Sequence, residues 1–130
     1  MVVAMGKTGV KKADLKTVRK LITTAGTSLA GPVPAGMKRW VTFIRIVNQH
    51  TGIQKIWICS TPAAMTATTP AAASAAAKVS FYLQALEREN LPERGPTELE
   101  NPLFCIAADK YFTAQPALGN ASVFAQYYDE

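Results

Sequence analysis

Residues 38–47 read Lys38-Arg39-Trp40-Val41-Thr42-Phe43-Ile44-Arg45-Ile46-Val47. Aromatic and β-branched side chains dominate this stretch, and such residues fit a pleated, packed surface. Bulky side chains fall on both faces of the strand that it predicts, because Trp40 and Ile44 share one face while Phe43 and Val47 share the other. We therefore expect a central strand that is covered, at least in part, on both sides.

A turn follows this strand directly. The loop Asn48-Gln49-His50-Thr51-Gly52 places a glycine where a hairpin needs a positive φ. Residues 53–59 then alternate as a returning strand, in which Ile56 and Ile58 face away from Trp57. The pattern predicts a hairpin over residues 38–60, at the heart of the domain.

The rest of the chain also indicates short strands. Three are predicted near the C-terminus, over residues 103–107, 111–115 and 121–128. Residues 70–90 are ambiguous, since the Ala-rich run after Thr69-Pro70 suggests a helix while Val79, Phe81 and Leu83 alternate like a strand. We favour a short helical turn or loop that gives way to a strand at about 79–86, with one continuous helix as the alternative.

These elements predict an all-β fold, a single β-sandwich or jelly-roll-like domain of roughly seven or eight strands with a minor helix. A chain of 130 residues fits one domain. We divide it into a basic N-terminal arm, residues 1–20, and a β-sandwich domain, residues 21–130. No stretch approaches the ~18 consecutive apolar residues of a membrane-spanning helix, and the opening residues are too short for a signal peptide.

Charge is unevenly distributed along the chain, whose net charge is +5. The arm holds six of the fourteen basic side chains against one acidic residue, Asp14; the six are Lys7, Lys11, Lys12, Lys16, Arg19 and Lys20. Residues 87–100 are acidic, with five glutamates against two arginines. A basic arm and an acidic loop on one small domain can attract another copy or a phosphate backbone, although a solvated, mobile tail is the simpler interpretation of the arm.

The reactive side chains argue against catalysis. His50 is the single histidine, so a cluster of histidine ligands cannot form within one chain. Cys59 and Cys105 each lie in an apolar run outside any C-x-x-C unit, which favours buried free thiols over a zinc site or disulfide scaffold. No nucleophile elbow, phosphate loop or dinucleotide fingerprint occurs. We expect no enzyme activity, no cofactor and no metal site.

Two segments share a pattern of turns and apolar strands with a known group of proteins. The first is Val33-Pro34-Ala35-Gly36 and the strand that follows it to Asn48. The second begins with Leu91-Pro92-Glu93, resumes at Pro102-Leu103-Phe104-Cys105-Ile106-Ala107-Ala108-Asp109, continues through Gln115 and ends with Gly119-Asn120-Ala121-Ser122-Val123. Together they resemble small β-sandwich structural proteins of tailed bacteriophages. Ala108-Asp109 stands where those proteins more usually have Gly-Asp, so the turn at this point is in question. The resemblance implies a virion or assembly protein and transfers no functional residue.

We therefore predict a virion structural protein, such as a capsid decoration or tail-associated subunit, with cytoplasmic localisation as the alternative. Its partners would be copies of itself and other virion proteins. The basic arm would contact an acidic surface of a neighbouring subunit. Apolar contacts must add to this interface because exposed ion pairs contribute little. The candidate apolar residues are Phe112, Leu118, Tyr127 and Tyr128.

The alternative function is a binding module for an anionic polymer, either nucleic acid or a surface polysaccharide, through the same arm. Basic side chains can neutralise phosphates, but the arm has no aromatic residues on which bases could stack. On sequence alone the arm supports only non-specific electrostatic contact with nucleic acid.

Overall fold

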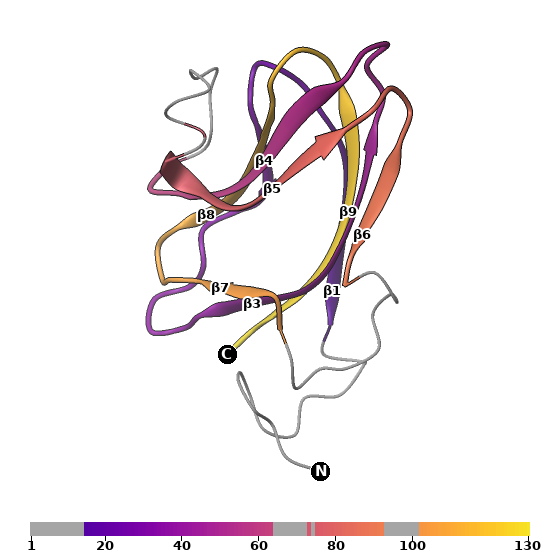
Figure 1. Ribbon diagram of the computed structural model, residues 1–130. Helices are drawn as coiled ribbons and strands as arrows, with labels where there is room; N and C mark the ends of the chain where they lie inside the picture. Colours follow the sequence, from indigo (N-terminus) through magenta and orange to yellow (C-terminus); the bar gives the residue numbers. More distant parts are fainter. Residues whose placement is uncertain (1–14, 64–72, 74, 93–101) are drawn as a thin grey trace.

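The computed structural model describes residues 15–63, 73, 75–92 and 102–130. This part of the chain is built almost entirely of β-strands, joined by turns (Figure 1). The strands are β1 (Lys16–Ile22), β2 (Thr27–Ala30), β3 (Arg39–Asn48), β4 (Gln54–Thr61), β5 (Ala77–Leu83), β6 (Arg88–Leu91), β7 (Phe104–Ile106), β8 (Tyr111–Pro116) and β9 (Ala121–Asp129). Ala73, Ala75 and Ala76 are helical, and no helix among the described residues is long and apolar enough to cross a membrane.

The strands form two antiparallel sheets. Sheet A has the order β1-β9-β3-β6. The short β7 pairs with the first residues of β3, on the same side as β6, which pairs with the last residues of β3. Sheet B has the order β2-β8-β4-β5. The two sheets pack against each other, which confirms the predicted all-β sandwich.

The pairing identifies the sandwich as a jelly roll. With β7 set aside, the first strand pairs with the last (β1–β9), the second with the second-last (β2–β8), the third with β6, and β4 with β5. This is the pattern of a long hairpin rolled up so that its two arms alternate between sheets, as in jelly-roll proteins.

The predicted hairpin over residues 38–60 is wrong in its pairing. β3 lies in sheet A between β9 and β6, whereas β4 lies in sheet B between β8 and β5, so the loop after Asn48 crosses from one sheet to the other. Both strands are interior, as expected. The alternation of side chains shows which faces a strand buries, but it carries no information about the strand that lies beside it.

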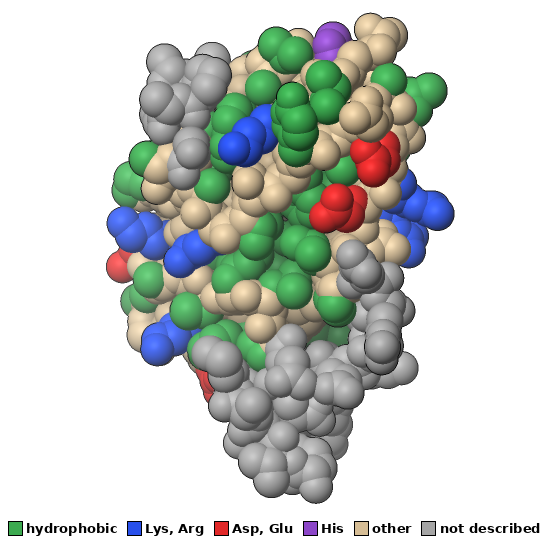
Figure 2. All heavy atoms as spheres, in the orientation of Figure 1, with side chains coloured by type: hydrophobic (Ala, Val, Ile, Leu, Met, Phe, Trp, Pro, Cys, Tyr) green, Lys and Arg blue, Asp and Glu red, His purple; other side chains and the backbone are tan. Residues whose placement is uncertain are grey.

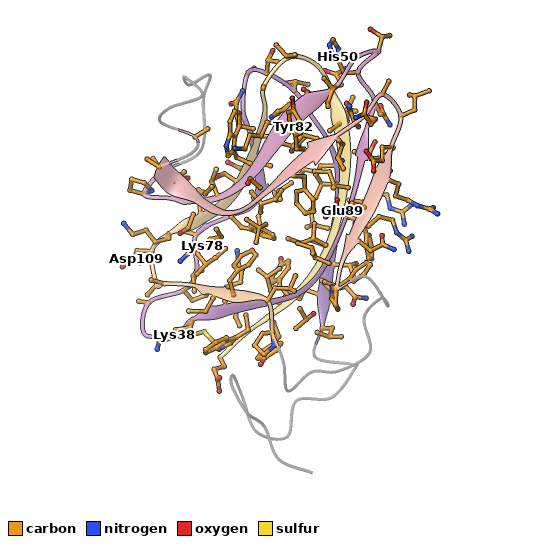
Figure 3. The ribbon with its side chains drawn as sticks, viewed as in Figure 1. Lys38, His50, Lys78, Tyr82, Glu89 and Asp109 are labelled. Carbon is orange, nitrogen blue, oxygen red and sulfur yellow. The ribbon has the colours of Figure 1, made fainter. Side chains whose placement is uncertain are left out.

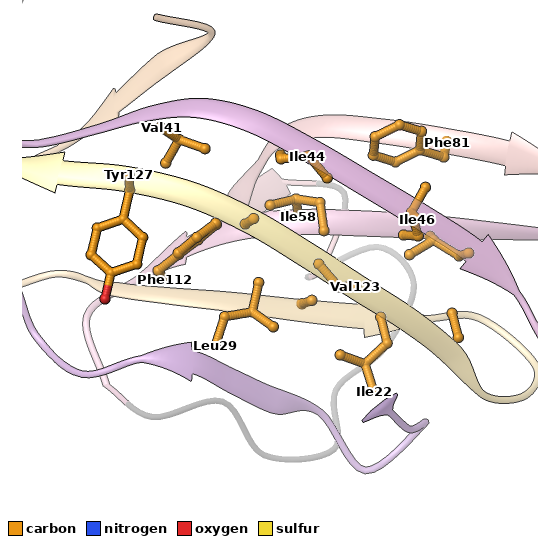
Figure 4. Close-up of a cluster of buried hydrophobic side chains, with 14 of the residues drawn as sticks. Ile22, Leu29, Val41, Ile44, Ile46, Ile58, Phe81, Phe112, Val123 and Tyr127 are labelled. Carbon is orange, nitrogen blue, oxygen red and sulfur yellow. The ribbon is translucent and has the colours of Figure 1, made fainter. Parts of the chain in front are cut away.

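The core lies between the inner faces of the sheets (Figure 4). Sheet A contributes Ile44, Ile46 and Val123, and sheet B contributes Ile58 and Phe81 across from them. Ile22, at the end of β1, is fully buried in the same cluster. The interior strands β3, β4, β8 and β9 therefore present alternate apolar residues to one continuous core, whose burial is the main source of the domain's stability.

The N-terminal boundary of the domain lies before residue 20. β1 begins at Lys16 and pairs with β9 along its whole length, so five of the residues that we assigned to the arm belong to sheet A. The Lys20 ammonium reaches across to sheet B and donates a hydrogen bond to the Ser28 carbonyl oxygen at 2.8 Å. Residues 1–14 lie outside the described residues, so the rest of the expected arm does too.

The ambiguous segment contains strands, not a continuous helix. β5 starts at Ala77, directly after the short helical stretch, and β6 follows a tight turn. The strand pattern of Val79, Phe81 and Leu83 therefore indicated the structure correctly. Edge pairing with β4 and burial of Phe81 and Leu83 outweigh the helix propensity of the alanines that precede them.

The unusual Ala108-Asp109 turn forms with a left-handed residue. Asp109 has φ +66°, and the Lys110 amide donates a 3.2 Å hydrogen bond to the Ala107 carbonyl oxygen. Aspartate tolerates this conformation better than most residues. The turn also pairs with Val33, whose backbone exchanges hydrogen bonds with Asp109 and Lys110.

A buried ion pair joins β3 to the end of β9. The Arg39 guanidinium donates to both carboxylate oxygens of Asp129, at 2.7 and 2.9 Å, and a third bond reaches the Gly31 carbonyl oxygen at 2.8 Å. The guanidinium also lies over the Tyr127 ring, 4.5 Å from its centre. Lys16 approaches the same carboxylate from solvent, at 3.9 Å.

Removing the carboxylate should destabilise the fold strongly. Asp129→Ala leaves the buried Arg39 charge without its counter-ion, and we expect a loss of about 3–5 kcal/mol in the free energy of unfolding, measured by urea denaturation. Lys16→Ala removes the exposed partner of the same carboxylate and should cost less than about 0.5 kcal/mol. Equal losses in the two variants would contradict this assignment.

Candidate functional site

Four connections gather at one end of the sandwich, which we call the loop end: residues 23–26, 49–53, 84–87 and 117–120. They lie together at the top of Figure 1, opposite the C-terminus. The strand register requires this arrangement, because Ala121 is opposite both Ile22 and Asn48, and Gln54 is opposite Leu83.

Asn48 ties two of these segments together from a fully buried position. Its amide nitrogen lies within 3.1 Å of the carbonyl oxygens of Gly52, Leu83 and Gln84. Its amide oxygen accepts from the His50 backbone N–H at 2.9 Å. One side chain therefore holds both the 49–53 loop and the 84–87 turn.

Gln54 extends this network to the 117–120 loop. Its amide nitrogen donates to the Asn48 side-chain oxygen at 2.8 Å, and its own oxygen accepts from the backbone N–H groups of Leu118 and Gly119, at 2.9 and 3.0 Å. Buried polar groups that are satisfied in this way fix the backbone around them. These three loops are therefore held in defined positions.

The loop end exposes large apolar side chains. Among the described residues, every exposed large hydrophobic side chain lies on these loops or next to them on an adjoining strand. They are Leu21, Ile53, Tyr82, Leu86 and Leu118, with exposed fractions of 52%, 37%, 67%, 72% and 63%. Figure 3 labels Tyr82 on β5, below this end, and His50 at its tip. In Figure 2 hydrophobic side chains lie around this histidine. Leu21 and Tyr82 project from the outer faces of sheets A and B, whereas Ile53, Leu86 and Leu118 lie on the loops themselves. Exposed apolar side chains that gather at one end are typical of a protein–protein contact.

Leu86 is strained as well as exposed. It has φ +61°, in the left-handed region that a γ-branched residue rarely adopts. Its turn is closed by the Glu87 amide, which donates to the Gln84 carbonyl oxygen at 3.1 Å, and by the Glu87 carboxylate, which accepts from the Gln84 amide at 2.7 Å. The fold therefore holds an apolar side chain in water at a position that would suit glycine.

His50 packs on the neighbouring loop. A Cβ atom built on Gly119 would lie only 2.5 Å from the His50 Nδ1 atom, so the imidazole occupies the space that glycine leaves. Within the described residues there is no group of three or more metal-ligating side chains. We assign His50 a packing role at the loop end.

A second surface covers the outer face of sheet A, where one row of side chains crosses four strands. Phe124 on β9 is opposite Arg19 on β1 and Arg45 on β3, and Arg45 is opposite Asn90 on β6. The row borders a hollow of about 330 Å³, whose lining includes Arg19, Arg45 and Phe124. Sequence reasoning missed this site, because its residues come from four separate strands.

The predicted basic interface residues have different positions. Lys7, Lys11 and Lys12 lie outside the described residues. Lys16 contacts the Asp129 carboxylate and Lys20 contacts Ser28, both at one edge of the sandwich. Arg19 is the one that joins the outer face of sheet A.

The predicted apolar interface residues also differ from one another. Phe112 is fully buried, in edge-to-face contact with Phe104 and Tyr127, so it belongs to the core and offers no surface to a partner. Tyr127 and Tyr128 are buried too. Both belong to β9, which is an interior strand between β1 and β3. Leu118 is exposed, at the loop end.

Both cysteines are free, as expected. Cys59 is buried on the outer side of sheet B beneath the helical stretch, with Trp57 and Ala73, and its thiol lies 3.5 Å from the Ala73 carbonyl oxygen. Burial raises the pKa of the Cys59 thiol from 9.0 to about 11. Cys105 is half-buried on β7.

Loss of the Asn48 side chain should loosen the loop end. Asn48→Ala removes the donor to three carbonyl oxygens and the acceptor for Gln54, so we expect a loss on the order of 3 kcal/mol in unfolding free energy. Hydrogen exchange should accelerate at the amides of Leu118 and Gly119. The exposed neighbour provides a control, since Gln49→Ala should cost under about 0.5 kcal/mol. Unchanged exchange at both amides would disprove the role of Asn48.

The two thiols should differ in reactivity. At pH 8 a thiol with a pKa of about 11 is ionised to about one part in a thousand, and thiolate is the form that reacts with iodoacetamide. We expect mass spectrometry of the native protein to find Cys105 modified and Cys59 protected, and both modified in urea. Native labelling of Cys59 at the rate of Cys105 would show that the helical stretch does not cover it.

No family model matches this chain, and no curated protein is significantly similar to it. Two surface features, the apolar loop end and the arginine–aromatic row on sheet A, are therefore the basis on which we propose a function.

Proposed function

We propose that this protein is a non-enzymatic structural subunit of a virion, which assembles by repeating one interface between copies of itself. In the form suggested by the resemblance of residues 33–48 and 102–123, it is a capsid decoration or tail-associated protein of a bacteriophage. The interface that we propose is the loop end.

The observation that carries this proposal is the gathering of exposed apolar side chains at one end of the molecule. Five large hydrophobic residues of the described chain are exposed, and all of them belong to the loop end or border it. Exposure of a single leucine is ordinary, but concentration at one end is not expected for a surface that faces only water. Burial of these side chains against another subunit would give the apolar contact that the assembly needs.

The rigidity of the loops supports the same function. Binding is weakened by the entropy lost when mobile loops become ordered. Asn48 and Gln54 already hold three of the four loops in the isolated subunit, so less entropy remains to be lost on association. The strained conformation of Leu86 is also easier to understand if its side chain contributes to a contact.

The fold agrees with this proposal by analogy. Jelly rolls build viral capsid domains, and they also occur in lectins and in cupins. A shared fold does not establish a shared function, so the proposal depends on the loop end.

The test removes apolar side chains from the loop end without unfolding the subunit. In Leu86→Gly/Leu118→Ser, glycine relieves the positive φ, so the variant should fold as well as the wild type. We expect wild-type oligomers in sedimentation velocity, and at least a tenfold rise in the dissociation constant of the variant, since each leucine buried in a contact contributes about 1.5–3 kcal/mol.

The matched control changes apolar residues at the opposite end of the sandwich. Ala35→Ser/Ala107→Ser alters two exposed alanines in the loops near Arg39 and should leave the oligomers unchanged. A wild-type chain that stays monomeric at all concentrations would overturn the proposal. Equal loss of assembly in both double variants would show that the loop end is not the interface.

A further inference from the structure

The outer face of sheet A has an unbalanced charge. Side chains that are opposite one another across an antiparallel sheet point to the same face. The register places Arg19 and Arg45 beside Phe124, and Arg88 beside Val47 in the next row. Glu89 belongs to the alternate positions of this sheet, which face the other way, and Glu87 lies in the turn before β6, where its carboxylate accepts from the Gln84 amide. Within strands β1, β3, β6 and β9 the charged side chains of this face are therefore all arginines.

Aromatic rings hold two of these arginines in place. The Arg19 guanidinium lies over the Phe124 ring, 5.3 Å from its centre, and that of Arg45 lies 5.7 Å from the centre of Phe43. The two rings contact each other edge to face, with centres 6.1 Å apart. Arg45 is oriented further by a 3.0 Å hydrogen bond from its Nε to the Asn90 side-chain oxygen. Two cations are thus positioned on one aromatic platform.

These guanidinium groups are available to a ligand. Arg19 and Arg45 are exposed, and within the described residues neither forms an ion pair with a carboxylate. The ion pairs found there involve Lys16 and Arg39 instead, both with Asp129. Beside the two arginines lies the hollow of about 330 Å³, with Ser122 and Leu21 in its lining. An anion that enters it would meet oriented N–H donors and an apolar ring together.

We propose that this face binds single-stranded nucleic acid, with phosphates on Arg19 and Arg45 and a base against Phe124. Guanidinium groups match phosphate oxygens in pairs of hydrogen bonds. A single strand leaves its bases free to stack on aromatic rings, and positively charged surfaces with such rings are typical of single-strand binding. Here the ring is the half-buried Phe124, which lines the hollow. The N-terminal arm has no aromatic residue on which a base could stack, whereas the outer face of sheet A has Phe124. This inference does not depend on the proposed assembly.

The basic residues that precede β1 strengthen the choice of ligand. Lys7, Lys11 and Lys12 come before Lys16 and Arg19 in the sequence, so the segment that leads into β1 is rich in positive charge. The whole chain also has a net charge of +5, which attracts a polyanion at long range. An acidic segment of another copy is the competing occupant, and the experiment separates the two.

The experiment measures binding of a fluorescently labelled 20-mer of oligouridylate to the full chain by anisotropy, at several salt concentrations. Arg19→Gln/Arg45→Gln should weaken binding at least tenfold. Because each phosphate contact on a single strand contributes about −0.7 to the log–log salt slope, loss of two contacts should make the slope shallower by about 1.4. Phe124→Leu should weaken binding about tenfold and leave the salt slope unchanged, since it removes stacking and not charge.

The control lowers the net charge by the same amount on the other sheet. Lys55→Gln/Lys78→Gln alters two exposed lysines of β4 and β5 and should change affinity less than threefold. Circular dichroism melting verifies that all variants are folded. No binding by the wild type at low salt would overturn the inference, as would equal weakening by both charge variants. If a polyglutamate peptide competed equally well for this face, its ligand would instead be an acidic protein segment. The loop-end variant Leu86→Gly/Leu118→Ser should bind the oligonucleotide like the wild type.

Discussion

The last strand of the chain holds sheet A together. β9 lies between β1 and β3, so sheet A is complete only when the C-terminal strand pairs with two strands from the N-terminal half. The buried pair between Arg39 and Asp129 secures the end of this strand. Every other pairing of the jelly roll is nested inside this one. Folding therefore depends on contacts between residues about a hundred positions apart, and such contacts form slowly because a long loop must close first.

The loop end combines a polar interior with an apolar surface. Asn48 and Gln54 use their amide groups to satisfy backbone donors and acceptors of three loops, so these loops need no apolar side chains to hold them. Leu86 and Leu118 are therefore free to point outward. The arrangement also explains why Gly119 is needed, since the His50 ring occupies the place of a side chain there. Loops that are rigid and carry exposed apolar side chains suit a surface that forms the same contact in each pair of subunits.

The two proposed surfaces meet at the end of β1. Leu21 is one of the exposed hydrophobic residues next to the loop end, and it also lines the hollow on the outer face of sheet A. Assembly through the loop end would leave the face of sheet A open, because its arginines project from the sheet and not from the loops. Figure 2 shows basic side chains along the edge of the molecule where β1 and β6 lie. One subunit could then contact its neighbours and a polyanion at the same time.

The amino-acid sequence by itself determined that the chain is all-β and where most strands lie, and it favoured free cysteines, because side-chain alternation, turn residues and apolar runs are local properties. That Cys59 and Cys105 do not pair was decided by the tertiary structure. It did not determine which strands are neighbours: β3 and β4 were expected to form a hairpin, yet they lie in different sheets. It also did not distinguish Phe112 and Tyr127, which are core residues, from Leu118, which is exposed, since all three follow similar local patterns. Both surface sites were decided only by tertiary structure. Arg19, Arg45 and Phe124 are far apart in the sequence, and only the cross-strand register brings them into one row, because hydrogen bonding between strands is a long-range property that no single segment encodes.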